Sequence, residues 1–259
     1  VQERRAELAA LARKYGPSLD EAIDYLDTGS GRLLELDNDS TRIDALRLEV
    51  EADRARLIDL AARLSGIRRE NAIRLSERVT GELAALAMAN AAVTVTVEDR
   101  PDYSMSGKDQ VSILLRPHSG AEPRPLGRGA SGGELSRVML AIEVVIAGSD
   151  PVPTFIFDEV DAGVGGAAAI EIGRRLARLS RTAQVIVVTH LAQVAAFATN
   201  HLRVTKDSDG AVTASSVHQL DGEERISEMA RLLSGLPDSE SGLTHARELI
   251  QSARELADR

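Results

Sequence analysis

The chain has 259 residues, of which 43% are hydrophobic, 27% are charged and 2% are aromatic, with no cysteine and a formal net charge of −9. This composition is typical of a globular chain with an aliphatic core, and it excludes a disulfide scaffold and thiolate metal sites. Neither an apolar run of about 20 residues nor a charged-then-apolar leader is found, so we expect a cytoplasmic protein without a membrane partner. The negative charge argues against nucleic acid bound over the whole surface, although a local basic patch remains compatible with it.

The first helical pattern covers residues 1–15 and ends at the Gly16–Pro17 pair, because proline cannot continue a helix. Ser18 and Glu21 then have the spacing of a capping box, which predicts the start of a second helix. Residues 28–31, with the sequence TGSG, predict a soft spot that interrupts this helix.

Further along, apolar residues recur at heptad spacing in two seams, which is typical of a coiled coil. The seams consist of Leu36, Ile43, Val50, Leu57 and Leu64, and of Leu46, Leu60 and Ile67. Asp39 and Asp53 interrupt them, and after Ile67 the spacing lengthens to that of a straight helix. Residues 1–91 therefore predict either a long projecting arm, which we favour, or a solvated helical hairpin or bundle.

From residue 92 onwards the pattern changes to strands that alternate with helices. Strands are predicted at residues 93–97, 110–115, 154–157, 184–188, 201–206 and 211–218. Helices are predicted at residues 134–147, 167–180, 191–198, 223–233 and 239–257. The strands at 154–157 and 184–188 are rich in apolar residues and are predicted to be buried, as in a parallel sheet, and a turn at 207–210 joins the last two strands. The fold class is therefore α/β, with a domain boundary between an arm at 1–91 and a globular part at 92–259.

The tetrapeptide Ser131-Gly132-Gly133-Glu134 precedes an apolar helical pattern. One interpretation is structural: Ser131 is the N-cap, Glu134 is the third helical residue, and the two close a capping box. A second interpretation is a phosphate site, since the free backbone N–H groups of a helix N-terminus attract anions and the glycines leave room for them. The two interpretations are compatible.

Polar residues follow both apolar strands of the expected parallel sheet. Asp158 and Glu159 come directly after the first strand, and His190 follows the second. Ligands of open α/β sheets bind at the carboxyl ends of strands, where Asp158 would meet Mg²⁺ and Glu159 would orient water. The alternatives are a solvated acidic turn and a structural histidine.

The order and spacing of three segments resemble one family, the ABC ATPases in their SMC-like branch. GASGGELSR resembles the signature motif, IFDEVDAGVGG resembles the Walker B motif with its D-loop, and VVTH resembles the switch-histidine strand. The resemblance implies the C-terminal lobe of an ABC/SMC-type ATPase head with a long coiled-coil arm. It also implies ATP and Mg²⁺ as cofactors and a role in the repair of DNA double-strand breaks.

The resemblance assigns a role to each candidate site residue. Nucleotide contacts are expected from Ser131, Gly132, Gly133, Glu134 and Asp161. Asp158 would hold the metal, while Glu159 and His190 would be catalytic. In this family the signature loop faces the ATP of the opposite head, so Ser131 would serve the partner's nucleotide and Asp158 the nucleotide of its own head.

The lysine loop that grips phosphate, G-x-x-x-x-G-K-S/T, does not occur in the sequence, whose only lysines are Lys14, Lys108 and Lys206. The resemblance therefore implies three partners: an N-terminal lobe that carries this loop, a second copy for head-to-head pairing, and DNA. We expect the chain alone to be inactive and its location to be cytoplasmic and nucleoid-associated. The alternatives are a noncatalytic dimerisation or scaffold module with the same fold, and a transporter ATPase subunit.

Overall fold

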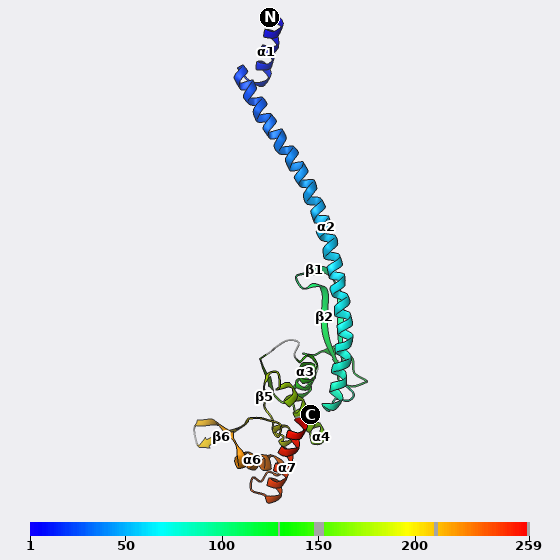
Figure 1. The fold of residues 1–259 in the computed structure, drawn as a ribbon, viewed down its shortest axis with the longest axis vertical. Coiled ribbons are helices and arrows are strands. Elements are labelled where there is room, and N and C mark those ends of the chain that lie inside the picture. The colour runs from blue at the N-terminus through cyan, green and yellow to red at the C-terminus, as the bar shows by residue number, and fades with distance from the viewer. Residues whose placement is uncertain (129, 148–152, 210–211, 258–259) are drawn as a thin grey trace. The chain divides into compact units, whose positions relative to one another are not determined.

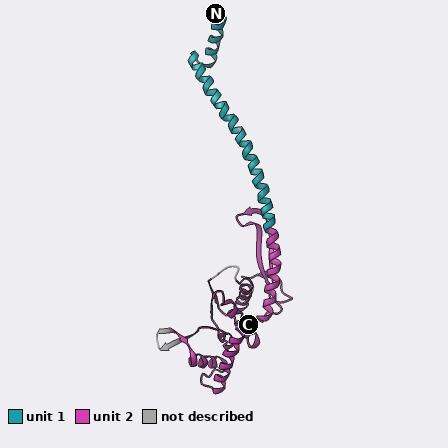
Figure 2. Ribbon diagram, in the orientation of Figure 1, with its two compact units in different colours: residues 1–64 teal, residues 65–259 magenta. Residues whose placement is uncertain are grey.

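The computed structural model describes residues 1–128, 130–147, 153–209 and 212–257 (Figure 1). The chain divides into two compact units, residues 1–64 and 65–259 (Figure 2). This boundary precedes the one at residue 91 expected from the sequence. The difference arises because the last part of the long helix α2 (Leu19–Ala85) belongs to the second unit, where Val79 and Leu83 are fully buried in the core.

The first unit contains helix α1 (Gln2–Tyr15) and the first part of α2. The break at Gly16 is confirmed, and the Ser18 Oγ accepts a hydrogen bond of 3.2 Å from the Glu21 N–H, which is one half of the expected capping box. The expected soft spot at residues 28–31 is wrong, because α2 runs through it without interruption. A glycine inside a helix costs only about 1 kcal/mol, so the helix-forming residues around Gly29 and Gly31 keep the segment helical.

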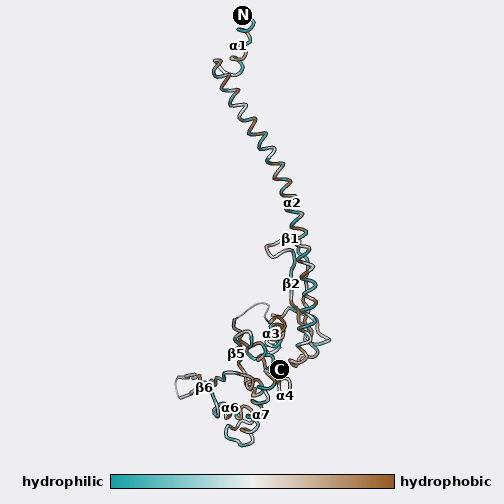
Figure 3. Tube along the Cα trace, in the orientation of Figure 1, coloured by the Kyte–Doolittle hydropathy of each residue, from teal (hydrophilic) through white to brown (hydrophobic). Residues whose placement is uncertain are grey.

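The heptad seams lie on the surface of α2. Leu36, Val50 and Leu57 all have about half or more of their side-chain surface exposed, and Figure 3 shows apolar and polar residues interspersed along the whole helix. An apolar seam of this kind is stabilised when a second helix covers it. The seam is therefore open to a partner helix.

The second unit begins with an antiparallel sheet in which β1 (Ala92–Ser104) pairs with β2 (Gly107–Arg116). This confirms the expected pairing, with Val93 opposite Leu115. A two-residue strand that the sequence did not predict, β3 (Arg124–Pro125), adds to β2. The edge of β1 is joined to α2 because the Val93 N–H donates to the Thr80 Oγ1 at 3.0 Å and the Val95 N–H to the Ser76 Oγ at 2.9 Å.

A second, parallel sheet follows, with β4 (Thr154–Phe157) beside β5 (Gln184–Val187). Helix α3 (Gly132–Ile146) precedes β4, α4 (Gly166–Leu179) connects the two strands, and the short α5 (Ala192–Ala195) follows β5. The expected parallel βαβ order is confirmed. The expectation that both strands are buried holds for one face only, since Phe157 is in the core but Ile156 is 71% exposed and Ile186 is 45% exposed. Helices cover one face of this sheet, and the alternation of side chains leaves the other face apolar and open.

The main core joins α3, α4 and the end of α2, and Leu83, Leu140 and Ile172 are fully buried in it. A smaller core lies around α6 (Gly222–Ser234) and α7 (Glu240–Ala257). Between the cores in sequence, β6 (His201–Asp209) pairs antiparallel with β7 (Val212–Leu220). Of the turn expected at 207–210, residues 207–209 belong to β6 and Gly210 lies outside the described residues. In the ranges given above, no helix combines the length and hydropathy needed to cross a membrane.

Candidate functional site

The first turn of α3 has the capping box expected from the sequence. The Ser131 Oγ accepts from the Glu134 N–H at 3.3 Å, and the Glu134 Oε2 accepts from the Ser131 N–H at 2.9 Å and from its hydroxyl at 3.0 Å. The bond from the Ser131 N–H is the main cause that holds the pKa of Glu134 below its ordinary value. Both halves of the capping box are thus formed, and the helix begins after an exposed serine.

The acidic turn after β4 packs against this first turn. Glu159 has φ = 56°, a left-handed backbone conformation that non-glycine residues adopt at a cost on the order of 1 kcal/mol or more. A Cβ placed on Gly132 would lie only 2.6 Å from the Glu159 Oε2, so the carboxylate lies directly over the glycine. The structure therefore brings Gly132 and Glu159 together, although 26 intervening residues separate them in the sequence.

The second glycine of the tetrapeptide has a packing role. A Cβ on Gly133 would lie 2.9 Å from both the Ala162 Cβ and the Glu159 carbonyl oxygen. From the sequence, both glycines were expected to leave room for phosphate. In the structure, Gly133 leaves room for the loop at residues 159–162.

Two further residues of α3 hold the same loop, and neither of them is among the residues predicted from the motifs. The Ser136 hydroxyl donates to the Asp158 carbonyl at 2.7 Å, and the buried Arg137 donates through Nη1 to the Ala162 carbonyl at 2.9 Å. Burial lowers the pKa of Arg137. Both residues follow Gly133 at helical i+3 and i+4 spacing, which is the signal in the sequence that places them on the same face of the helix.

Asp161 connects the loop to the end of β5. Its carboxylate is 2% exposed and accepts from the Thr189 hydroxyl and, at 3.2 Å, from the His190 N–H. The His190 Nδ1 lies 3.4 Å from the same oxygen, while the imidazole as a whole is 73% exposed. Asp161 was expected to contact the nucleotide, which remains a prediction. Its observed contacts orient Thr189 and His190.

The candidate site thus lies where the N-terminus of α3 meets the carboxyl ends of β4 and β5. Gly132 contacts Glu159, and Asp161 contacts His190. Asp158 is exposed next to them. Among the described residues, no three histidine, aspartate or glutamate side chains gather into a metal-binding cluster. Asp158 could therefore contribute one oxygen ligand to a metal ion, but not a complete set. The arrangement combines a helix N-terminus, two exposed carboxylates and an oriented imidazole.

The fold is that of an SMC-type head with a coiled-coil helix. It is similar to the Smc head domain with a coiled coil and joint derived from Pyrococcus yayanosii, with a TM-score of 0.51 and 19% sequence identity. The match covers 98% of this chain and 42% of that chain. This likeness defines the class of protein through its fold.

The sequence relatives identify the family within that class. The chain is 56% identical over 223 residues to the DNA repair protein RecN of Streptomyces coelicolor, which covers 82% of this chain and 39% of the relative. It is 46% identical to RecN of Mycobacterium leprae, over 97% of this chain and 46% of the relative. No family model matches. The chain belongs to the RecN family, and it spans less than half the length of these curated relatives.

Proposed function

We propose that this chain is the carboxyl-terminal part of an SMC-like ATPase that acts in the repair of DNA double-strand breaks. The observation that best supports this role is the packing of Glu159 over the first turn of α3 at a strained backbone position. A strained backbone position persists only where the surrounding structure holds it in place. Such positions concentrate at functional sites. Asp161 adds His190 to the same edge of the fold.

The residues at this edge have the donor chemistry that Mg²⁺ and ATP require. Ser131 and the backbone N–H groups at the start of α3 suit phosphate oxygens, and the helix dipole favours negative charge there. Asp158 offers the oxygen ligand that Mg²⁺ prefers. When bound, Mg²⁺-ATP supplies the phosphoryl group and a cation that neutralises its developing charge. Gly132, Gly133, Glu134 and Asp161 complete the proposed nucleotide-binding set, of which Gly133, Glu134 and Asp161 act by positioning the loop, the cap and the imidazole.

Glu159 and His190 are the proposed catalytic residues. The Glu159 carboxylate can accept a proton from water and orient it, which is the role of a general base. The Asp161 carboxylate next to the His190 Nδ1 favours a proton on that nitrogen, so that Nε2 is left as an acceptor for water or a bound hydroxyl. Both side chains are exposed and can therefore reach a bound substrate.

The proposal includes three partners. An N-terminal lobe with the phosphate-gripping lysine loop would cover the open face of the β4–β5 sheet, where Ile156, Ile186 and Val188 are exposed. An antiparallel helix joined to that lobe would cover the seams of α2. A second copy would place its nucleotide at Ser131, and Asp158 would serve the nucleotide of its own head. We also propose DNA as the substrate, which the similarity to a DNA repair protein supports, and a cytoplasmic, nucleoid-associated location.

The proposal is tested by calorimetry and hydrolysis assays with Mg²⁺-ATP. The chain alone should bind ATP barely or not at all. Mixing it with the part of the S. coelicolor relative that lies outside the matched region should restore both binding and hydrolysis. Micromolar binding by the chain alone would mean that the nucleotide site is misplaced, and binding without hydrolysis in the mixture would favour a noncatalytic dimerisation module.

In the same mixture, Glu159→Gln should retain ATP binding and slow hydrolysis by about 100-fold or more, because geometry is kept and basicity is lost. Glu224→Gln is the matched control, since Glu224 is an exposed glutamate on α6. Turnover of the Glu159 variant within a few-fold of the control would remove Glu159 from the catalytic role.

A further inference from the structure

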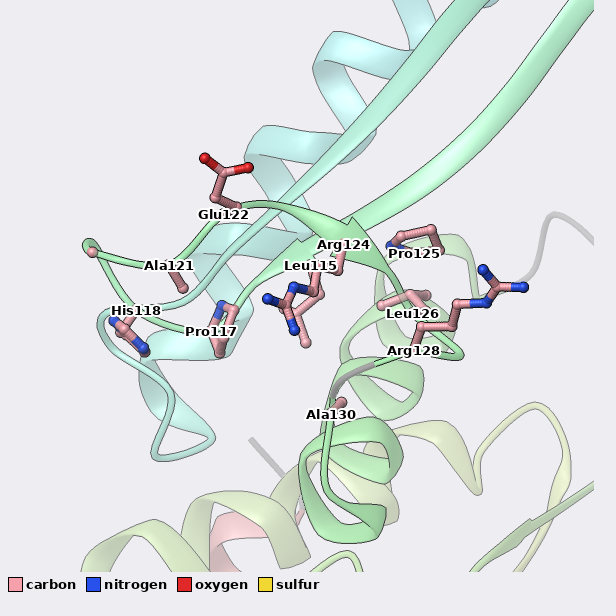
Figure 4. Close-up of a pocket in the computed structure, with 11 residues that line it drawn as sticks. Leu115, Pro117, His118, Ala121, Glu122, Arg124, Pro125, Leu126, Arg128 and Ala130 are labelled. Carbon is pink, nitrogen blue, oxygen red and sulfur yellow. The ribbon is translucent and has the colours of Figure 1, made fainter.

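A groove of about 370 Å³ lies in the second unit between the end of β2, the short β3 and the segment that leads into α3 (Figure 4). Its lining includes Arg124 on β3, Arg128 after it, His118 and Glu122 in the connecting loop, and Ala130 next to Ser131. None of these residues was assigned a function above. The groove therefore adjoins the candidate site along the chain without sharing its residues.

The groove is basic in an otherwise acidic protein. Its lining contains two arginines and one glutamate, whereas the whole chain has 31 lysines and arginines against 40 acidic residues. Neither Arg124 nor Arg128 takes part in an ion pair within the part of the chain that the structure describes, and both are exposed. The Glu122 carboxylate points away from both guanidinium groups (Figure 4). The positive charge of the groove is thus not neutralised from within.

The directions of the two arginines indicate what kind of anion fits. Figure 4 shows the Arg124 guanidinium directed toward Pro117 and that of Arg128 directed the opposite way. Guanidinium groups bind phosphate through paired N–H donors, and two groups that diverge cannot clasp one phosphate between them. They suit separate phosphates, such as those along a nucleic acid strand.

The lining of the groove offers one ring that could stack on an unpaired base, the imidazole of His118. The lining contains no phenylalanine, tyrosine or tryptophan, and single-strand binding sites rely on such rings to stack with bases. A duplex exposes only its backbone and groove edges, so arginine contacts alone are sufficient for it. We propose that this groove binds the phosphate backbone of a nucleic acid duplex, and the choice of DNA rests on the proposed repair function.

The test measures fluorescence anisotropy of a labelled DNA duplex of about 30 base pairs with the full chain, without nucleotide, over a series of salt concentrations. The double variant Arg124→Gln/Arg128→Gln should bind at least about tenfold more weakly at low salt, and the slope of log affinity against log salt should fall by about 2, one for each lost phosphate contact. Arg78→Gln/Arg178→Gln is the matched control, because both arginines are exposed in the second unit and the charge change is the same. The control should retain the wild-type slope.

Three outcomes would overturn the proposal: no duplex binding by the wild type, an equal loss in the control variant, or tighter binding of a single-stranded oligo-dT of the same length that depends on Arg124 and Arg128. Circular dichroism establishes that both variants are folded. Because the DNA-binding test contains no nucleotide, a negative result in it does not contradict the proposed ATPase function. Likewise, a negative result in the hydrolysis test does not contradict duplex binding in the groove.

Discussion

The two units of the chain use their apolar residues in opposite ways. In the first unit the heptad residues Leu36, Val50 and Leu57 are exposed on a single helix. In the second unit Leu140 and Ile172 are fully buried in a core shared by several elements. The difference teaches that a regular helical pattern specifies a helix, whereas a core requires residues that meet from different parts of the chain.

The second unit also buries charged groups, each with partners. The Asp109 carboxylate accepts from the Ser65 hydroxyl at 2.6 Å and from the Arg68 guanidinium at 3.0 Å. The buried Glu228 accepts from Arg231 at 2.6 Å and 2.8 Å. Buried carboxylates with such partners connect the stability of this unit to pH.

The largest effect should come from removing a core side chain. Leu140→Ala in the second unit should lower its free energy of unfolding by about 2–5 kcal/mol, since it leaves a cavity between packed elements. Leu57→Ala in the first unit, at a 47% exposed position, should change stability by less than about 0.5 kcal/mol. Urea unfolding that is monitored by hydrogen exchange measures the stability of each unit separately. An equal loss of stability in the two variants would contradict the difference between the units.

A smaller effect should follow from acid. Hydrogen bonds from Arg231 hold the pKa of Glu228 below its ordinary value of 4.5. The folded state therefore binds fewer protons than the unfolded state as the pH falls below about 4.5. The contribution of ionised Glu228 to the free energy of unfolding is therefore present above that pH. It is lost as the pH drops through the pKa that Glu228 has in the folded state.

Glu228→Gln should flatten this acid dependence, because the variant has no proton to bind at that position. Unfolding by urea between pH 7 and pH 3 measures the slope for both proteins. An unchanged slope in the variant would remove Glu228 from the pH response of the second unit.

A further effect should come from the glycines, and its sign should differ between the units. Gly29→Ala and Gly31→Ala should each stabilise the α2 helix by about 1 kcal/mol, because neither new Cβ meets an atom within 4 Å. Gly173→Ala on α4 should destabilise the second unit, since its Cβ would collide with the Phe197 ring. Circular dichroism on heating measures both effects, and destabilisation by Gly29→Ala would contradict a continuous helix there.

The sequence by itself determined the local elements and the candidate residues. The capping box at Ser131, the pairing of β1 with β2 and the parallel order of β4 and β5 follow from short-range patterns, which act between neighbours in the chain. The motif resemblance also identified the family that the relatives confirm. The error at residues 28–31 arose because a local glycine signal was given more weight than the long helix around it.

Only the tertiary structure decided which of these residues meet. It placed Glu159 over Gly132, put Ala162 against Gly133 and turned the Asp161 carboxylate inward to His190. It also left one face of the β4–β5 sheet open and placed Arg124 in a groove beside the loop that leads to α3. The physical reason is that burial and contact depend on the path of the whole chain, which the spacing of residues along the sequence does not contain.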